Sequence, residues 1–246
     1  VGSISENKEL ERRVAITPDV VKKYVSQGFK VLIEKDYGNH LGFSDKEYQA
    51  EGCEIELRNN VIDKSNILLQ LDIPSQERLE QIKANKILIG TFNYYNNQEK
   101  FKNLVNKNIN IFSLELLPRI SRAQSMDILS SQANLAGYKA VVDSFANFNK
   151  AIPMMMTAAG TIPAAKVLVV GAGVAGLQAI ATAKRMGAIV FATDVRIASK
   201  EQVESLGGKF LSVEGSQNLE TEGGYAKEAS EDFRKKQEVL LAETLK

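Results

Sequence analysis

Cysteine and histidine are almost missing from this sequence, and their scarcity excludes several kinds of site. Cys53 is the single cysteine of the 246 residues, so an internal disulfide and a cysteine-rich zinc site are both excluded. His40 is the single histidine, so a serine–histidine or cysteine–histidine catalytic pair has only one candidate. A lone cysteine also fits a protein of a reducing compartment.

An excess of charge of either sign is missing as well. The 31 basic and 30 acidic side chains leave a formal net charge of +1 at pH 7. This balance provides no bulk attraction for an anionic membrane or for nucleic acid, and nucleic acid is therefore not an expected partner. With 44% hydrophobic and 25% charged residues, the composition is that of an ordinary globular protein.

Long uninterrupted apolar runs are also missing. The longest apolar stretch, residues 151–183, contains Pro153, Pro163 and the charged Lys166. Lys166 divides it into two pieces, each shorter than the about 20 residues that a membrane span needs. We therefore expect a buried loop, strand and helix there, and we expect Met154 to Met156 to fill the core rather than line a cofactor site. Neither a signal peptide nor an initiating methionine is present, so we expect the natural chain to begin earlier.

Short β-rich runs alternate with amphipathic runs through the first half of the chain. The expected strands are residues 30–33, 67–71, 86–89 and 109–113, and the expected helices are residues 18–27, 44–51, 76–83 and 98–106. A proline in the first turn of one helix, a capping box at another and glycines after their ends favour these bounds. Strands that alternate with helices predict a parallel sheet covered on both faces.

A long helix and a second α/β unit follow. Residues 124–147 lack proline and carry apolar residues at helical spacing, which predicts a helix that bridges two domains. After this helix, the expected strands are residues 167–170, 189–192 and 209–213, and the expected helices are residues 174–186, 201–206 and 228–245.

A glycine motif opens the second unit. Gly171, Gly173 and Gly176, with Val174 and Ala175 between them, form the pattern G-x-G-x-x-G between an expected strand and an apolar helix. In a dinucleotide-binding fold the first glycine permits the tight turn, the second lets backbone approach the pyrophosphate, and the third allows close helix–strand packing. We take all five residues as candidate cofactor-binding residues.

An acidic residue stands where such a fold binds the adenosine ribose. Asp194 lies just after the next expected strand, 18 residues beyond Gly176. A carboxylate there accepts hydrogen bonds from the ribose hydroxyls and repels a 2′-phosphate, which favours NAD over NADP. Val195 and Arg196 belong to the same candidate site, and the charge of Arg196 complicates that preference. The alternative is a purely structural glycine turn in which Asp194 caps a helix.

These patterns predict an α/β fold with two Rossmann-like domains, whose parallel sheets are joined by a long helix. We expect an N-terminal α/β domain over residues 1–123, a bridging helix over 124–148 and a NAD-binding Rossmann domain over 149–246. A dinucleotide-binding sheet has two three-stranded halves, and only the first half is visible. We therefore expect the second domain to be truncated at its C-terminus.

A polar loop precedes the bridging helix. Arg119, Gln124 and Asp127 offer a cation, an amide and a carboxylate, which suit the nicotinamide carboxamide, its ribose and the pyrophosphate. Residue types alone make this a weak signal: the alternative is that Arg119 is only a solvated charge and that Asp127 only favours the helix N-terminus.

Several runs resemble the NAD(H)-binding domain of proton-translocating nicotinamide nucleotide transhydrogenases. The most specific are PRISRAQSMD at residues 118–127 and SSQANLAGY at residues 130–138. The match continues through residues 153–160, 171–181, 192–196, 200–207 and 223–228, so it covers most of the chain.

The resemblance implies roles for particular residues. It implies that Arg119, Gln124 and Asp127 are catalytic in the sense that they hold the nicotinamide ring of NAD(H) toward a second nucleotide, with Ser130 assisting. It also implies that Asp194 holds the adenosine ribose. Residues 214–227 then correspond to the family's mobile loop, with the cofactor-binding Tyr225 near its tip; the alternative is an ordinary surface loop.

The implied reaction is hydride transfer between NADH and NADP⁺. NADP(H) is expected on a partner, the NADP-binding or beta subunit, and a membrane domain is expected to couple the transfer to proton movement. The resemblance also implies a homodimer, peripheral on the cytoplasmic side of the bacterial inner membrane. Hydride passes directly between the two cofactor rings, so no side-chain acid or base is required, which agrees with the scarcity of histidine. We expect the fragment alone to be inactive.

Two alternatives remain open. The run ERRVAITP at residues 11–18 is similar to alanine dehydrogenases, in which Arg13 would correspond to the substrate-carboxylate binder. That family places a catalytic lysine and a catalytic histidine where this chain has LDIP at residues 71–74 and GTFNYY at residues 90–95. Without them, amino-acid oxidation lacks its acid–base groups. The other alternative is a nucleotide-sensing module without turnover, which has no need to orient the nicotinamide ring.

Overall fold

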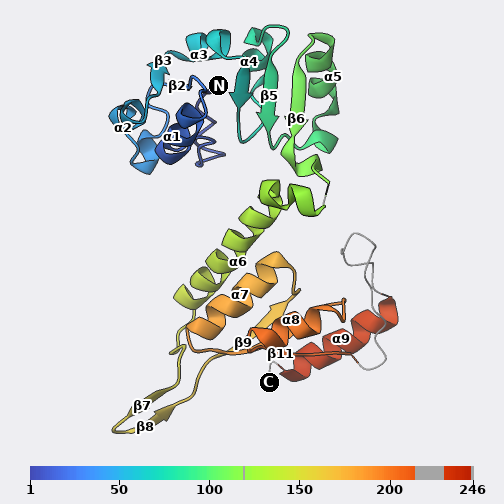
Figure 1. The fold of residues 1–246 in the computed structure, drawn as a ribbon. Coiled ribbons are helices and arrows are strands. Elements are labelled where there is room, and N and C mark those ends of the chain that lie inside the picture. Colours follow the sequence, from blue (N-terminus) through green and yellow to red (C-terminus); the bar gives the residue numbers. More distant parts are fainter. Residues whose placement is uncertain (119, 214–229, 245–246) are drawn as a thin grey trace. The chain divides into compact units, whose positions relative to one another are not determined.

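The computed structural model describes residues 1–118, 120–213 and 230–244 (Figure 1). The chain divides into two compact units, Val1–Asp127 and Ile128–Lys246. Each unit has its own parallel sheet and its own buried core.

The first unit is built on a six-stranded sheet. Its strands are β1 (Gly2–Ser3), β2 (Leu32–Glu34), β3 (Glu54–Glu56), β4 (Ile67–Leu69), β5 (Ile87–Gly90) and β6 (Asn110–Ser113). They lie in the order β3-β2-β1-β4-β5-β6, and all neighbouring pairs are parallel. This is the strand order of a doubly wound dinucleotide-binding sheet. The predicted α/β fold class is therefore confirmed.

Both faces of this sheet are buried. Leu32 of β2 belongs to one apolar cluster together with Leu88 of β5. The next residue, Ile33, belongs to a second cluster with Tyr37 and Tyr48. Because successive side chains of a strand point to opposite faces, these two clusters lie on the two sides of the sheet, as the helical crossovers of a parallel sheet require.

The helices of the first unit are α1 (Pro18–Ser26), α2 (Asp45–Ala50), α3 (Arg58–Lys64), α4 (Gln76–Gln81) and α5 (Gln98–Asn106). Local chemistry favours the start of two of these five helices, α1 with its first-turn proline and α2 with its capping box. The expected capping box forms at α2: the N–H of Ser44 donates to Glu47 Oε2 at 2.7 Å, and the N–H of Glu47 donates to Ser44 Oγ at 3.4 Å. Each satisfies a backbone group that the helix leaves without a partner.

The sequence pattern does not predict β1, β3 or α3. β1 is only two residues long, and its buried side chain is polar: Ser3 Oγ lies 2.7 Å from Tyr37 Oη and donates to the carbonyl oxygen of Leu69 at 2.7 Å. β3 has glutamates at both ends, and no side chain caps the start of α3. Apolar periodicity and capping residues, the two signals used for prediction, are thus absent from these elements.

The second unit has a three-stranded parallel sheet covered by helices. Its strands β9 (Lys166–Val170), β10 (Ile189–Thr193) and β11 (Lys209–Phe210) lie in the order β11-β10-β9. Its helices are α6 (Ile128–Ala146), α7 (Val174–Arg185), α8 (Ser199–Ser205) and α9 (Glu231–Thr244). The core joins Ile180 and Ala183 of α7 to Val190 and Ala192 of β10. This arrangement corresponds to one half of a dinucleotide-binding sheet.

The long helix expected over residues 124–147 begins later than predicted. Ser121–Met126 forms a 3-10 segment, and α6 starts at Ile128. Within the second unit α6 runs alongside α7 (Figure 1). The two helices approach closely at Gly137, where a Cβ atom would lie 2.0 Å from the carbonyl oxygen of Ala175. Glycine at this position therefore sets how near α6 lies to the start of α7.

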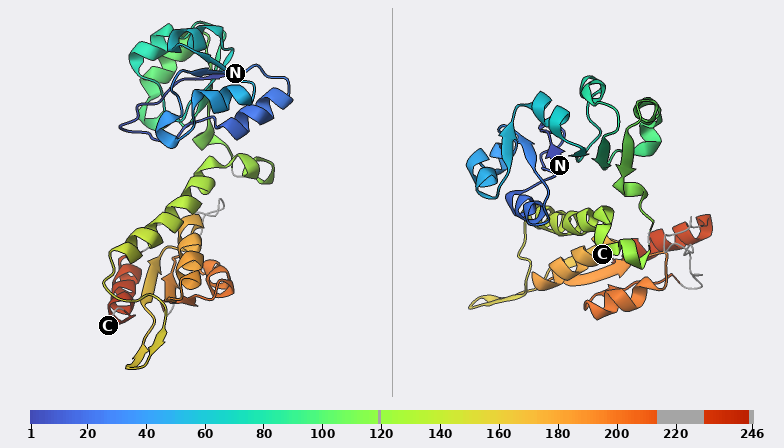
Figure 2. Two further views of the ribbon diagram at one scale, coloured as in Figure 1. Left: turned by 90° about the vertical axis from the view of Figure 1, so that its left-hand side faces the viewer. Right: turned by 45° about the horizontal axis from the view of Figure 1, so that its top comes forward.

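A hairpin extends from the second unit. β7 (Met155–Thr157) and β8 (Gly160–Ile162) pair antiparallel, and Figures 1 and 2 show them projecting away from the rest of this unit. All of their residues are exposed, Met156 by 82%. The expectation that Met154 to Met156 fill the core is therefore wrong, because an apolar run indicates a buried surface without saying what buries it. In the described part of the chain, no helix is long and apolar enough to cross a membrane.

Candidate functional site

The three motif glycines connect β9 to α7, and each is a glycine for a different physical reason. Gly171 has a φ of +94°, which other residues rarely adopt. Gly176 lies so close to the turn that a Cβ atom would be 1.8 Å from the carbonyl oxygen of Gly171. Gly173 has an ordinary φ of −77°, and the nearest described atom to its Cβ position is Arg196 Nη2, at 4.0 Å. The fold requires the first and third glycines, whereas the second leaves space beside the backbone.

The start of α7 supplies backbone donors next to that space. Gly173 is the N-cap residue, and no side chain caps the helix. The N–H groups of the first turn, at Val174, Ala175 and Gly176, have no acceptor within the helix. Together with the positive end of the helix dipole, such groups favour an anion. The connection therefore has the geometry of a phosphate-binding loop.

Asp194 lies directly after β10 and joins that strand to the glycine loop. Its Oδ2 accepts a hydrogen bond of 2.7 Å from the N–H of Ala172, which lies between the first two glycines. Its Oδ1 accepts the N–H of Arg196 at 2.8 Å. The Arg196 guanidinium also donates to both oxygens, from Nε to Oδ1 and from Nη2 to Oδ2, each at 3.0 Å. The alternative interpretation of Asp194 as a helix cap is not supported, since no side chain caps α8.

Burial and hydrogen bonding act in opposite directions on Asp194. Its side chain is only 6% exposed, and burial raises the pKa of a carboxyl group. The donors of Arg196 and the N–H of Ala172 lower it, and together they hold the pKa of Asp194 below its ordinary value. The carboxylate is therefore charged at neutral pH.

The structure brings most candidates of the second unit together. Gly171, Gly173, Val174, Ala175 and Gly176 form the loop and first turn of α7, and Asp194, Val195 and Arg196 form the turn after β10. Ser130 lies near the start of α6, about two helical turns before Gly137.

The remaining candidates belong to the first unit or lie outside the described residues. Gln124 is exposed within the 3-10 segment, and Asp127 ends that segment, half-buried. The N–H of Asp127 donates to the carbonyl oxygen of Gln124 at 3.3 Å. Arg119 and Tyr225 lie outside the described residues.

Two residues of this site were not found from the sequence. Ala172 fills a variable position of the glycine motif, yet its N–H donates to Asp194 and holds that carboxylate against the loop. Gly137 lies far from the motif in sequence, and its closeness to Ala175 follows only from the packing of α6 on α7. A glycine within an otherwise helical run was the one available signal for it.

The first unit has a pocket at the carboxyl ends of its strands. It has a volume of about 630 Å³, and its polar lining includes Glu6, Asp72, Arg78, Asn93 and Lys100. It lies where strand order reverses between β1 and β4, which is where open α/β sheets bind ligands. Burial raises the pKa of Glu6, although the N–H groups of Leu71 and Asp72 oppose the shift. The charges around the pocket are mixed, so it does not define one class of ligand.

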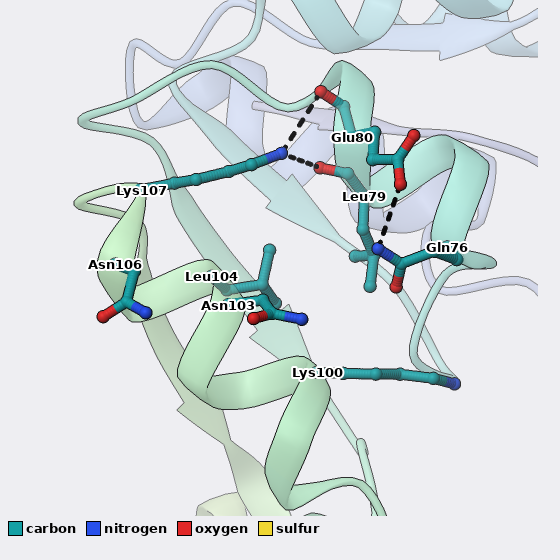
Figure 3. A pocket seen from close by; sticks show the side chains of 8 residues that line it. All are labelled: Gln76, Leu79, Glu80, Lys100, Asn103, Leu104, Asn106 and Lys107. Carbon is teal, nitrogen blue, oxygen red and sulfur yellow. Dashed lines mark hydrogen bonds between the residues drawn. The ribbon is translucent and has the colours of Figure 1, made fainter.

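The first unit also has a smaller pocket between α4 and α5, where two polar side chains make hydrogen bonds to α4 (Figure 3). Lys107 Nζ donates to the carbonyl oxygens of Leu79 at 3.5 Å and Glu80 at 3.4 Å. A lysine in this position caps the C-terminal end of α4. Gln76 Nε2 donates to the Glu80 carboxylate at 3.1 Å, one turn later in the same helix. These hydrogen bonds therefore stabilise α4.

The fold and the glycine loop define a protein of the Rossmann dinucleotide-binding class. Within that class, the chain belongs to the alanine dehydrogenase/PNT family. The model of the family's N-terminal domain matches residues 2–136, and that of its C-terminal domain matches residues 140–246. The resemblance inferred from the sequence motifs is confirmed.

Bacterial transhydrogenase subunits are similar over the whole chain. A Rickettsia prowazekii protein, named as the first part of NAD(P) transhydrogenase subunit alpha, is 48% identical over 251 residues, covering 100% of this chain and 66% of the relative. The protein of the same name from Rhodospirillum rubrum is 49% identical, covering 98% of this chain and 65% of the relative. The chain thus spans about two thirds of the length of these curated relatives.

Solved structures of both branches of the family have this fold. A transhydrogenase from Sinorhizobium meliloti superimposes with a TM-score of 0.81 at 45% identity, covering 87% of this chain and 64% of that one. An L-alanine dehydrogenase superimposes with a TM-score of 0.72 at 20% identity, covering 86% of this chain and 60% of that one. The second likeness concerns the fold alone.

Proposed function

We propose that this chain is the NAD(H)-binding component of a proton-translocating transhydrogenase. The observation that carries the proposal is the glycine loop of the second unit, held to a charged Asp194 through the N–H of Ala172. Similarity at 48% identity to transhydrogenase alpha subunits supports the particular reaction.

NAD(H) binds along the carboxyl ends of the second unit's strands. Its pyrophosphate lies against Gly173 and the first-turn N–H groups of α7, where no Cβ atom blocks the approach. Asp194 accepts the hydroxyls of the adenosine ribose. Arg119, Gln124 and Asp127 hold the nicotinamide end with Ser130, and Tyr225 also binds the nucleotide.

The reaction is direct hydride transfer between C4 of NADH and C4 of NADP⁺. The electron pair and the hydrogen leave the dihydronicotinamide ring together and arrive on the second ring, so no proton has to be added or removed by a side chain. The chain contributes alignment of its own nucleotide and exclusion of water. NADP(H) is held by a partner subunit.

The partners follow from the same proposal. An NADP-binding beta subunit supplies the second nucleotide, and a membrane domain couples transfer to proton movement. The component is peripheral on the cytoplasmic side of the bacterial inner membrane. The exposed side chains of Met155, Met156 and Ile162 on the β7–β8 hairpin support a homodimer, because apolar side chains gathered on a projecting element favour a protein interface.

The alternative function is an alanine dehydrogenase-like oxidation of an amino acid. The observation that favours it is the pocket of the first unit, which lies beside Asp72 and Asn93 after β4 and β5. At those two strand ends the chain has neither the lysine nor the histidine that the alternative requires. His40 does not replace the histidine, since it lies in a 3-10 turn with its Nε2 2.7 Å from the carbonyl oxygen of Arg12.

A reconstitution experiment separates these functions. The chain is mixed with a recombinant NADP-binding partner subunit, and hydride transfer from NADPH to an NAD analogue with distinct absorbance is followed. We expect transfer that needs both proteins and that slows by about ten- to a hundredfold in Arg119→Ala and Gln124→Ala, because misplaced rings react slowly. The matched control, Gln202→Ala on the exposed surface of α8, retains the wild-type rate.

Two results would argue against the proposal. NADH binding without any transfer would leave a nucleotide-sensing module. Oxidation of NADH with pyruvate and ammonium, in the absence of the partner, would instead establish the alanine dehydrogenase-like reaction.

A further inference from the structure

The carboxylate of Asp194 already has a full set of donors from this chain. A carboxylate offers about four acceptor positions. Oδ1 accepts from the N–H and from Nε of Arg196, and Oδ2 accepts from the N–H of Ala172 and from Nη2 of Arg196. Ribose hydroxyls cannot donate to this carboxylate unless one of these groups leaves.

Arg196 is the group that is able to leave. The N–H of Ala172 and the N–H of Arg196 are fixed by the backbone, whereas the guanidinium is the end of a flexible side chain that is 18% exposed. Its Nε and Nη2 form a planar pair of donors, one to each carboxylate oxygen. The vicinal 2′- and 3′-hydroxyls of a ribose present a similar pair of donors to a carboxylate. The guanidinium therefore occupies the position that a ribose diol needs.

The same guanidinium reaches toward the phosphate end of the site. Its Nη2 lies 4.0 Å from the Cβ position of Gly173, the glycine that leaves space beside the loop. Because the guanidinium is also paired with Asp194, a 2′-phosphate carried on the ribose would meet a cation instead of a bare carboxylate. Arginine binds phosphate and carboxylate with the same fork of donors.

We propose that Arg196 sets the nucleotide specificity of this site by competing with the ribose diol for Asp194. This inference rests on the proposed NAD(H) binding. Arg196 takes the diol's place on the carboxylate, so NADH binds only by displacing it. For a 2′-phosphorylated nucleotide the pair stays together, and Arg196 offsets the repulsion by Asp194. The arginine thereby weakens NADH binding and strengthens NADPH binding. It reduces the ratio of NADH affinity to NADPH affinity.

The test measures adenosine, NADH and NADPH binding to wild type and to Arg196→Ala. Adenosine carries the diol without any phosphate, so it reports on the competition alone. We expect Arg196→Ala to bind adenosine and NADH several-fold more tightly, up to about tenfold, because the competing charged hydrogen bonds are gone. NADPH binding weakens by a similar factor, so the ratio of NADH to NADPH affinity rises.

The matched control is Arg185→Ala, which removes the same charge from an exposed position in the last turn of α7. All three affinities should stay at their wild-type values there. If Arg196→Ala fails to fold, as judged by thermal unfolding, Arg196→Gln replaces it. Arg196→Gln also removes the charge and the paired donors of the guanidinium. It should therefore raise the ratio of NADH to NADPH affinity as Arg196→Ala does.

Particular outcomes would overturn the inference. Unchanged affinities in Arg196→Ala would show that the arginine does not compete. A parallel loss of NADH and NADPH binding with adenosine unaffected would make Arg196 a ligand of the pyrophosphate only. Absence of NADH binding by wild type is a different result, since it would refute the proposed function itself.

Discussion

Substitution of Gly173 by alanine should affect nucleotide binding much more than it affects the stability of the fold. At this position φ is −77° and ψ is −168°, a conformation open to any residue, and an added Cβ atom meets only Arg196 Nη2 among the described atoms, at 4.0 Å. Gly173→Ala should therefore cost no more than the weaker N-cap preference of alanine, about 0.5–1 kcal/mol. The new methyl group would nevertheless stand where the pyrophosphate must approach the backbone.

The expected loss of affinity is larger than the loss of stability. A charged hydrogen bond that is broken or lengthened is worth ~1.5–3 kcal/mol, which corresponds to about a ten- to hundredfold weaker Kd for NADH. The assay pairs an NADH fluorescence titration with thermal unfolding of the same samples. A Gly173→Ala variant that binds NADH as wild type does would refute the placement of the pyrophosphate.

Gly176→Ala is the contrasting variant. Its Cβ atom would lie 1.8 Å from the carbonyl oxygen of Gly171, so the backbone must shift. Overpacking of this kind costs ~3 kcal/mol, of which the better helix propensity of alanine recovers ~1 kcal/mol. Thermal unfolding should therefore detect a loss of about 2 kcal/mol before any nucleotide is added. A Gly176→Ala variant as stable as wild type would contradict the close contact between the start of α7 and the backbone of Gly171.

Four further predictions follow from single contacts. Gly137→Ala, despite its better helix propensity, should destabilise the second unit by ~1–2 kcal/mol in urea unfolding, because its Cβ atom meets a backbone oxygen of α7 at 2.0 Å. Lys86→Met should destabilise the first unit by about 3 kcal/mol in the same assay, since Lys86 Nζ donates to three backbone carbonyl oxygens at the end of α3. Met156→Asp, on the exposed hairpin that we propose as the homodimer interface, should shift the mass measured by light scattering from dimer to monomer. The stability difference between wild type and Asp194→Asn should be constant above about pH 4 and should shrink below it, because a carboxyl group with a lowered pKa stabilises the fold only while it is ionised. Unchanged stability of Gly137→Ala or of Lys86→Met would contradict the contact described for that residue. An unchanged mass of Met156→Asp would contradict the proposed interface. For Asp194→Asn, a stability difference that persists at about pH 2 would contradict the lowered pKa.

Local chemistry made the conformation of the glycine loop predictable. The β-branched strand before Gly171 and the apolar helix after Gly176 limit the turn between them to a few conformations, and the glycine spacing identifies which one. The structure agrees, with a positive φ at Gly171 and a close approach at Gly176. The capping box of Ser44 and Glu47 was predictable for the same reason, since both partners lie within four residues.

Features that depend on distant partners were not predictable. β1 is held in the centre of its sheet by hydrogen bonds to strands far along the chain, and its buried side chain is the polar Ser3. The apolar run around Met156 indicates a core residue, but the structure has Met156 exposed on the β7–β8 hairpin. The pairing of Arg196 with Asp194 depends on side-chain geometry, because two residues this close in sequence are equally able to point apart.

We propose above that this chain presents NADH for direct hydride transfer to NADP⁺. The most direct test uses NADH that carries deuterium at both C4 positions, mixed with NADP⁺, this chain and a recombinant NADP-binding partner subunit. Mass spectrometry of the NADPH product then follows the label. We predict that the deuterium arrives on NADPH without dilution by solvent. Label found in water, or NADPH formed without it, would contradict direct transfer and the function proposed for this chain.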